Sequence, residues 1–118
     1  MDSILTSVKK LLGVAEEYTH FDPDLIMHIN SVLGILTQLG VGPKEGFYID
    51  GDSASWSDFI DDQHTLNGVK SYIGIKVKML FDPPTSASVL DAMNRLASEL
   101  EWRLRAECDS NNKQQDGG

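Results

Sequence analysis

Residues 21–40 read FDPDLIMHINSVLGILTQLG, and this stretch carries the clearest structural signal in the chain. Its apolar residues recur every three or four positions, which is the spacing of one face of an α-helix. They are Leu25, Ile26, Ile29, Val32, Leu33, Leu36 and Leu39. Asp22 suits the N-cap, Pro23 suits the first turn, and Gly40 suits the end of the helix. The stretch therefore predicts a core helix.

The residues before this helix predict a shorter one. Ser3 can cap it, Gly13 can end it, and its apolar residues have helical spacing. These are Ile4, Val8, Leu11 and Leu12. A polar link, residues 16–21, joins the two predicted helices.

A third helix is predicted over residues 66–81, and it is apolar over most of its circumference. One face holds Leu66, Val69, Ile73, Val77 and Leu80, and a second face holds Tyr72, Ile75 and Met79. Such a helix is either central in its own fold or in contact with a partner. Asp82-Pro83-Pro84 predicts its end, because proline cannot continue the hydrogen-bond ladder.

The last helix is predicted over residues 86–107, with a single apolar stripe. The stripe consists of Val89, Leu90, Met93, Leu96, Ala97, Leu100 and Leu104. Trp102 falls on the opposite side. The polar residues that follow have nothing to bury. We therefore expect a helical domain over residues 1–107 and a disordered tail over residues 108–118.

Residues 41–64 interrupt the helical pattern with a long insert. It includes a candidate for a short β-like piece, Phe47–Ile49, and a possible helical turn capped by Ser55 or Ser57. Connections of this length in a compact domain are uncommon and are usually functional or disordered. The predicted fold is all-α: a small bundle of about four helices with this insert between the second and the third.

The 118 residues suffice for one domain, and their 41% hydrophobic content is typical of globular proteins. The net charge of −8 argues against a nucleic-acid-binding protein, which needs a basic surface. The acidic residues cluster: six lie between Lys44 and His64, whereas residues 65–81 hold three lysines and no acid. This asymmetry indicates either a solvated loop or complementary charge between neighbouring copies.

The sequence contains no grouping typical of a catalytic or cofactor site, and we predict neither an enzyme nor a bound metal or cofactor. Asp61, Asp62 and His64 offer ligand types that suit a divalent ion, but their spacing matches no metal-binding loop. Cys108 is the only cysteine, so no disulfide forms within the chain. No signal peptide or membrane-spanning stretch of about 20 apolar residues is present. We expect synthesis in a reducing cytoplasm.

Several large apolar side chains lie outside the predicted core stripes. They form a candidate protein interface, since tryptophan and tyrosine dominate binding hot spots. The candidates are Trp56, Phe59, Tyr72, Ile75, Met79 and Trp102. The alternative is that the insert folds back and covers these groups within one subunit.

A series of short motifs runs in order along the chain. They are Leu11-Leu12-Gly13, Phe21-Asp22, Leu39-Gly40-Val41-Gly42, Trp56-Ser57-Asp58-Phe59, Val69-Lys70-Ser71-Tyr72-Ile73, Leu80-Phe81-Asp82-Pro83-Pro84 and Glu101-Trp102-Arg103-Leu104. This order resembles the head–tail connector, or adaptor, proteins of tailed phages (siphophages), over about residues 4–104. The combination of Phe-Asp-Pro-Pro with a later Glu-Trp-Arg-Leu helix end is its most specific part.

The resemblance implies a structural subunit of the virion at the head–tail junction, made in the host bacterial cytoplasm. Such subunits form a homo-oligomeric ring, commonly of twelve copies, which docks beneath the portal protein. The ring also meets a further head-completion or tail-terminator protein, and DNA passes through it without sequence-specific binding. No membrane is involved. Two other functions stay open: a helical adaptor or regulatory protein in a host complex, and a small metal-dependent enzyme.

Overall fold

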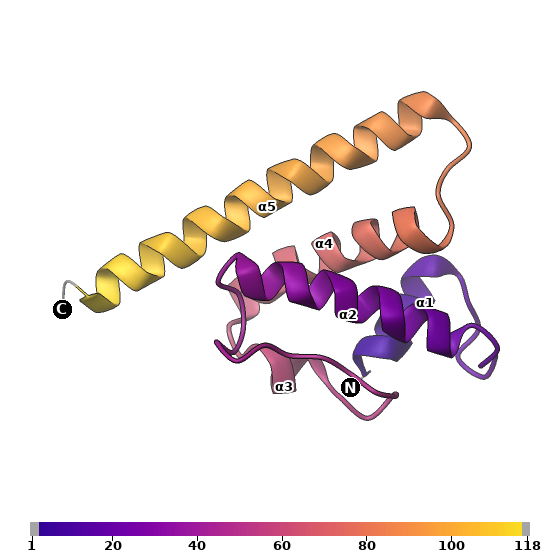
Figure 1. Ribbon diagram of the computed structural model, residues 1–118, viewed down its shortest axis with the longest axis horizontal. Helices are drawn as coiled ribbons and strands as arrows, with labels where there is room; N and C mark the ends of the chain where they lie inside the picture. The colour runs from indigo at the N-terminus through magenta and orange to yellow at the C-terminus, as the bar shows by residue number, and fades with distance from the viewer. Residues whose placement is uncertain (1–2, 117–118) are drawn as a thin grey trace.

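The central element of the fold is α4 (Gln63–Phe81), which packs against three other helices. The computed structural model describes residues 3–116, with side-chain surroundings given as far as Asp109. Over these residues it contains α1 (Ile4–Leu12), α2 (Asp22–Gln38), α3 (Trp56–Phe59), α4 and α5 (Ala87–Asp116), and no strand. Figure 1 shows α5 along one side of α4, with α1 and α2 on the other. The predicted all-α fold is confirmed.

Helix α2 forms at the predicted place and buries the predicted stripe. Leu25, Ile29, Val32, Leu33 and Leu36 are fully inaccessible to solvent. One detail of the prediction is wrong: the N-cap is Phe21, and Asp22 is the first helical residue. The reason is an ion pair, because the Asp22 carboxylate faces the Lys9 ammonium instead of the amides of its own helix.

Helix α1 has both predicted ends. The Ser3 hydroxyl accepts a hydrogen bond from the Thr6 amide, at 3.1 Å, and Gly13 closes the helix with a φ of 76°. A left-handed backbone of this kind favours glycine, which has no Cβ to clash.

A buried lysine joins α1 to the start of α2. The Lys9 side chain is almost inaccessible, and its ammonium donates to the carbonyl oxygens of Glu16 (2.8 Å) and Tyr18 (2.7 Å). The same nitrogen lies 2.9 Å from Asp22 Oδ1. The buried ammonium thus makes two hydrogen bonds to backbone carbonyls and one ion pair with a carboxylate. The polar link 16–21 is therefore held by Lys9, a residue of α1 that lies outside the link, so the sequence of the link alone does not predict its conformation.

The insert folds back onto its own chain. Its predicted helical turn is α3, with Ser55 as N-cap and the Ser55 amide donating to Asp58 Oδ2 at 2.9 Å. The candidate β-like piece at Phe47–Ile49 forms no strand. Instead of a neighbouring strand, the Asn30 side chain binds this segment: Ile49 N donates to Asn30 Oδ1 (2.7 Å), and Asn30 Nδ2 donates to Ile49 O (2.9 Å).

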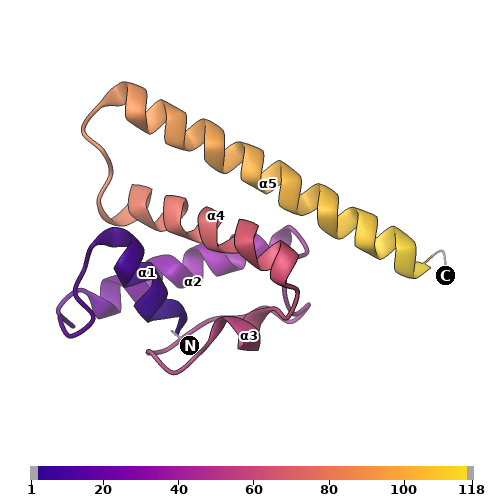
Figure 2. The same ribbon diagram turned by 180° about the vertical axis from the view of Figure 1, so that it is seen from behind.

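Helices α4 and α5 form a long antiparallel pair joined by residues 82–86 (Figure 2). Helix α4 begins at Gln63, earlier than the predicted residue 66, because the Asp62 carboxylate accepts from the His64 amide and the Thr65 hydroxyl. It ends at Phe81, before the two prolines, as predicted. Helix α5 continues past the predicted end near Glu107 to Asp116. The disorder of residues 108–118 stays a prediction.

Candidate protein interface

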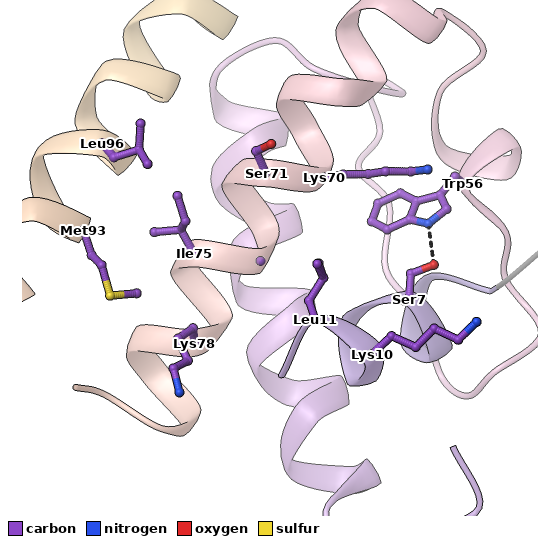
Figure 3. A pocket seen from close by; sticks show the side chains of 11 residues that line it. Ser7, Lys10, Leu11, Trp56, Lys70, Ser71, Ile75, Lys78, Met93 and Leu96 are labelled. Atoms are coloured by element: carbon purple, nitrogen blue, oxygen red, sulfur yellow. Dashed lines mark hydrogen bonds between the residues drawn. The ribbon is translucent and has the colours of Figure 1, made fainter. Parts of the chain in front are cut away.

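A groove of about 700 Å³ opens between α1, α4 and the N-terminal half of α5 (Figure 3). Its apolar lining comes from Leu11, Trp56, Ile75, Met93 and Leu96. Three lysines also line it: Lys10, Lys70 and Lys78. The groove thus combines an apolar surface with positive charge, in a chain whose net charge is negative.

The groove exists because α5 is only partly covered by the rest of the chain. Ala97 and Leu104, in its middle and later turns, are buried, whereas Val89 and Leu96 are exposed. Figures 1 and 2 both show the N-terminal end of α5 standing away from α4. One continuous apolar stripe therefore serves two purposes: its later part packs on α4, and its earlier part remains unpartnered within the subunit.

The lysines of the groove are held beside its apolar surface. Lys70 Nζ lies 5.5 Å from the centre of the Trp56 ring, within the range of a cation–π contact. Lys78 Nζ lies 2.7 Å from Asp82 Oδ2, one helical turn further on. Both residues of that pair are substantially exposed, so the pair contributes little stability and leaves Lys78 available to another carboxylate.

The six predicted interface residues divide into two groups. Trp56, Phe59 and Tyr72 are buried in the core of the same chain. The Trp56 indole also donates from Nε1 to Ser7 Oγ at 2.9 Å, so it is held between α3 and α1. Trp56 and Phe59 belong to the back-folded insert itself, as the alternative prediction has it, whereas Tyr72 is buried beside α5. Ile75 and Met79 are partly exposed, and Trp102 is 71% exposed. An interface role stays a prediction for all six residues.

The sequence did not single out Leu11, Met93 and Leu96 as surface groups, because each belongs to a regular helical stripe. The signal that the sequence offered for these residues was the length of the last predicted helix. The last predicted helix is longer than the one preceding it, so a single neighbour could not cover its whole stripe. The groove is the uncovered part.

Tyr72 is buried against α5, and this position affects its acidity. Burial, aided by the nearby Glu101 carboxylate, raises the pKa of the Tyr72 phenol well above its usual range. The unfolded chain releases this proton near pH 10, whereas the folded chain keeps it. The contribution of Tyr72 to the free energy of unfolding is therefore fully present below about pH 10 and is lost as the pH rises further.

Tyr72→Phe should remove this part of the alkaline destabilisation. Between pH 8 and pH 11 we expect the wild type to lose about 1 kcal/mol more unfolding free energy than the variant does. Urea unfolding followed by circular dichroism at both pH values measures the difference. Tyr48→Phe, at an exposed position, is the matched control. Equal losses in the wild type and in Tyr72→Phe would contradict the prediction.

The side chains that could have served as metal ligands or as a reactive thiol have contacts that stabilise the fold or suppress reactivity. The Asp62 carboxylate caps α4, and its hydrogen bonds to Thr65 and His64 lower its pKa. Burial raises the pKa of the Cys108 thiol, which disfavours the reactive thiolate. Within residues 3–109 no group of three or more potential ligand side chains is placed to hold a metal ion. Across the described chain, no helix combines the length and the apolar character needed to cross a membrane.

The comparison with protein families supplies the decisive observation. A family described as phage connector protein matches residues 4–111, which is nearly the whole chain. The chain belongs to the phage connector protein family. No curated protein and no solved structure matches it.

Membership in the phage connector protein family identifies the chain as a structural component of a phage particle, and the family is not an enzymatic one. The predicted family resemblance is thereby confirmed.

Proposed function

We propose that this connector protein is a ring-forming subunit at the head–tail junction of the virion. The ring docks beneath the portal protein, meets a head-completion or tail-terminator protein below, and lets DNA pass through its lumen. Family membership carries the proposal. The groove between α1, α4 and α5 supports it, because a small domain with surplus apolar surface gains stability by assembling.

The distribution of charge also supports this function. The net charge of −8 leaves the chain without the basic surface that grips phosphates. DNA can therefore slide past such a subunit. Ring closure requires two different surfaces on each copy, because ring contacts are head-to-tail. The groove is one such surface, and exposed aromatic residues outside it, such as Tyr48 and Trp102, can form the other.

Native mass spectrometry of the full chain, alone and mixed with the portal protein of the same phage, tests the proposal. We expect a discrete ring of many copies bound to the portal ring, and negative-stain electron microscopy should show it beneath the portal. A chain that stays monomeric at high concentration and also ignores the portal would contradict the proposal. A monomer that assembles only on the portal would support it.

A further inference from the structure

The insert presents an acidic and aromatic strip on its outer side. Over residues 47–52 the exposure alternates: Phe47 and Gly51 are partly exposed and Ile49 is buried, whereas Tyr48, Asp50 and Asp52 are exposed. The backbone bends at residues 50–52, so the feature that the three outer residues share is their exposure to solvent. We refer to Tyr48, Asp50 and Asp52 as the acidic strip. Tyr48 is its most exposed member, at 78%.

The fold holds the acidic strip in place. Asn30 binds both the amide and the carbonyl of Ile49, and the Ile49 side chain is buried. Phe47 packs beside Phe59, with ring centres 5.2 Å apart. Since the inward side chains are anchored, the outward direction of Tyr48 is imposed on it. Tyrosine is enriched in binding hot spots, and here its side chain is presented to solvent by an anchored backbone.

The groove has the complementary chemistry. Its apolar lining, including Leu11, Ile75 and Leu96, suits an aromatic ring, and its lysines suit carboxylates. In the part of the chain that the structure describes, Lys70 contacts the Trp56 ring and forms no ion pair. Lys78 has only its exposed pairing with Asp82. Lys70 is therefore available to a carboxylate of a partner, and the exposed Lys78–Asp82 pair can exchange its carboxylate for another.

Within one copy the acidic strip and the groove are separate surfaces, because none of Tyr48, Asp50 and Asp52 lines the groove. The segment between α2 and α3 begins beside α5, where Gly40 lies near Cys108, and then runs along the face of the molecule away from α5 (Figures 1 and 2). A second copy can supply the missing partner, and the contact is then head-to-tail, as ring assembly requires.

We infer that the acidic strip of one copy docks into the groove of the next copy. The Tyr48 ring packs on the apolar lining, and Asp50 and Asp52 pair with Lys70 and Lys78. This inference rests on the proposed ring-forming function and specifies the two surfaces that build the ring. Complementary charge sets the register of the contact, and the apolar lining supplies most of its affinity.

Charge reversal with rescue tests the contact. The strip variant is Asp50→Lys with Asp52→Lys, and the groove variant is Lys70→Glu with Lys78→Glu. Each variant alone sets like charges against each other, so we expect self-association, measured by analytical ultracentrifugation with and without portal protein, to weaken at least about tenfold. An equimolar mixture restores opposite charges at every contact when the two variants alternate around the ring. The mixture should therefore recover most of the wild-type affinity.

Lys76→Glu is the matched control, because Lys76 lies on α4 outside the groove lining. We expect association to stay close to the wild-type value. Circular dichroism of each variant checks that the subunit is folded, and the exposed or partly exposed positions of the substituted residues favour this.

Cross-linking gives an independent readout that does not depend on affinity alone. In a Cys108→Ser background, chains with Asp52→Cys are mixed with chains carrying Ser71→Cys, and a short bismaleimide reagent is added. Ser71 is exposed and lines the groove, so we expect cross-linked pairs. Asp52→Cys mixed with Met27→Cys, an exposed position on α2, should give none.

The outcomes separate this inference from the proposed function. Rings that ignore both charge reversals, or that give no 52–71 cross-link, overturn the inference and leave the connector function intact. Variants that self-associate normally but lose the portal also overturn it, because the groove then binds the portal. A chain that contacts neither itself nor the portal overturns both.

Discussion

Trp56→Ala is expected to lower the free energy of unfolding of the isolated subunit by about 3–5 kcal/mol, the range for truncating a buried aromatic residue. Only 3% of the Trp56 side chain is accessible, and its indole hydrogen bonds to Ser7 in α1. Truncation leaves a cavity between α3 and α1 and removes the partner of the Ser7 hydroxyl. Urea unfolding of the isolated subunit, followed by circular dichroism, measures the change.

Trp102→Ala is the matched control, because it removes the only other tryptophan in the chain. Its side chain is largely exposed, so we expect a change within about 0.5 kcal/mol in the subunit. If Trp102 is an interface anchor, the same variant weakens assembly on the portal. Equal destabilisation of the isolated subunit by the two substitutions would contradict this assignment and make Trp102 a core residue.

Lys9→Ala is expected to cost about 3 kcal/mol of unfolding free energy, at the lower end of the range for removing one member of a buried ion pair. The lysine is buried, but the Asp22 side chain is 22% accessible, so water can partly solvate the carboxylate that remains. The carbonyl oxygens of Glu16 and Tyr18 also lose their donor. The link between α1 and α2 should then become more susceptible to limited proteolysis.

Lys10→Ala provides the comparison for Lys9→Ala, since it removes the same side chain one position later at an exposed site. A change within about 0.5 kcal/mol is expected there. The two variants have the same net charge, so a difference between them reports the burial and contacts of Lys9. A loss below about 1 kcal/mol for Lys9→Ala would show that the ammonium contributes little to the fold.

The sequence by itself determined the helices whose signals are local. The apolar stripe of α2, the Ser3 and Gly13 caps of α1 and the proline stop after α4 all depend on residues within a few positions of one another. Such signals act in almost any tertiary context, so they can be recognised in the chain alone. The motif order that indicates the phage connector protein family is equally a property of the sequence, and the family match over residues 4–111 confirmed it.

Only the tertiary structure decided where the insert lies and which apolar groups it covers. The contacts that hold it join distant positions: Asn30 with Ile49, Ser7 with Trp56, and Ile4 N with Ala54 O at 2.9 Å. No local pattern reveals such pairings, because each depends on how the helices pack. The sequence therefore predicted an interface role for Trp56 and left a core position open as the alternative.

The groove, too, depends partly on the sequence and partly on the tertiary structure. The sequence revealed a second apolar face on residues 66–81 and placed Trp102 outside the stripe of residues 86–107, but it could not say which apolar groups stay uncovered. That depends on the oblique placement of α5, which buries Leu104 and leaves Leu96 exposed. The physical reason is that burial is a property of packed pairs of surfaces. The sequence determined the surplus, and the tertiary structure decided its location.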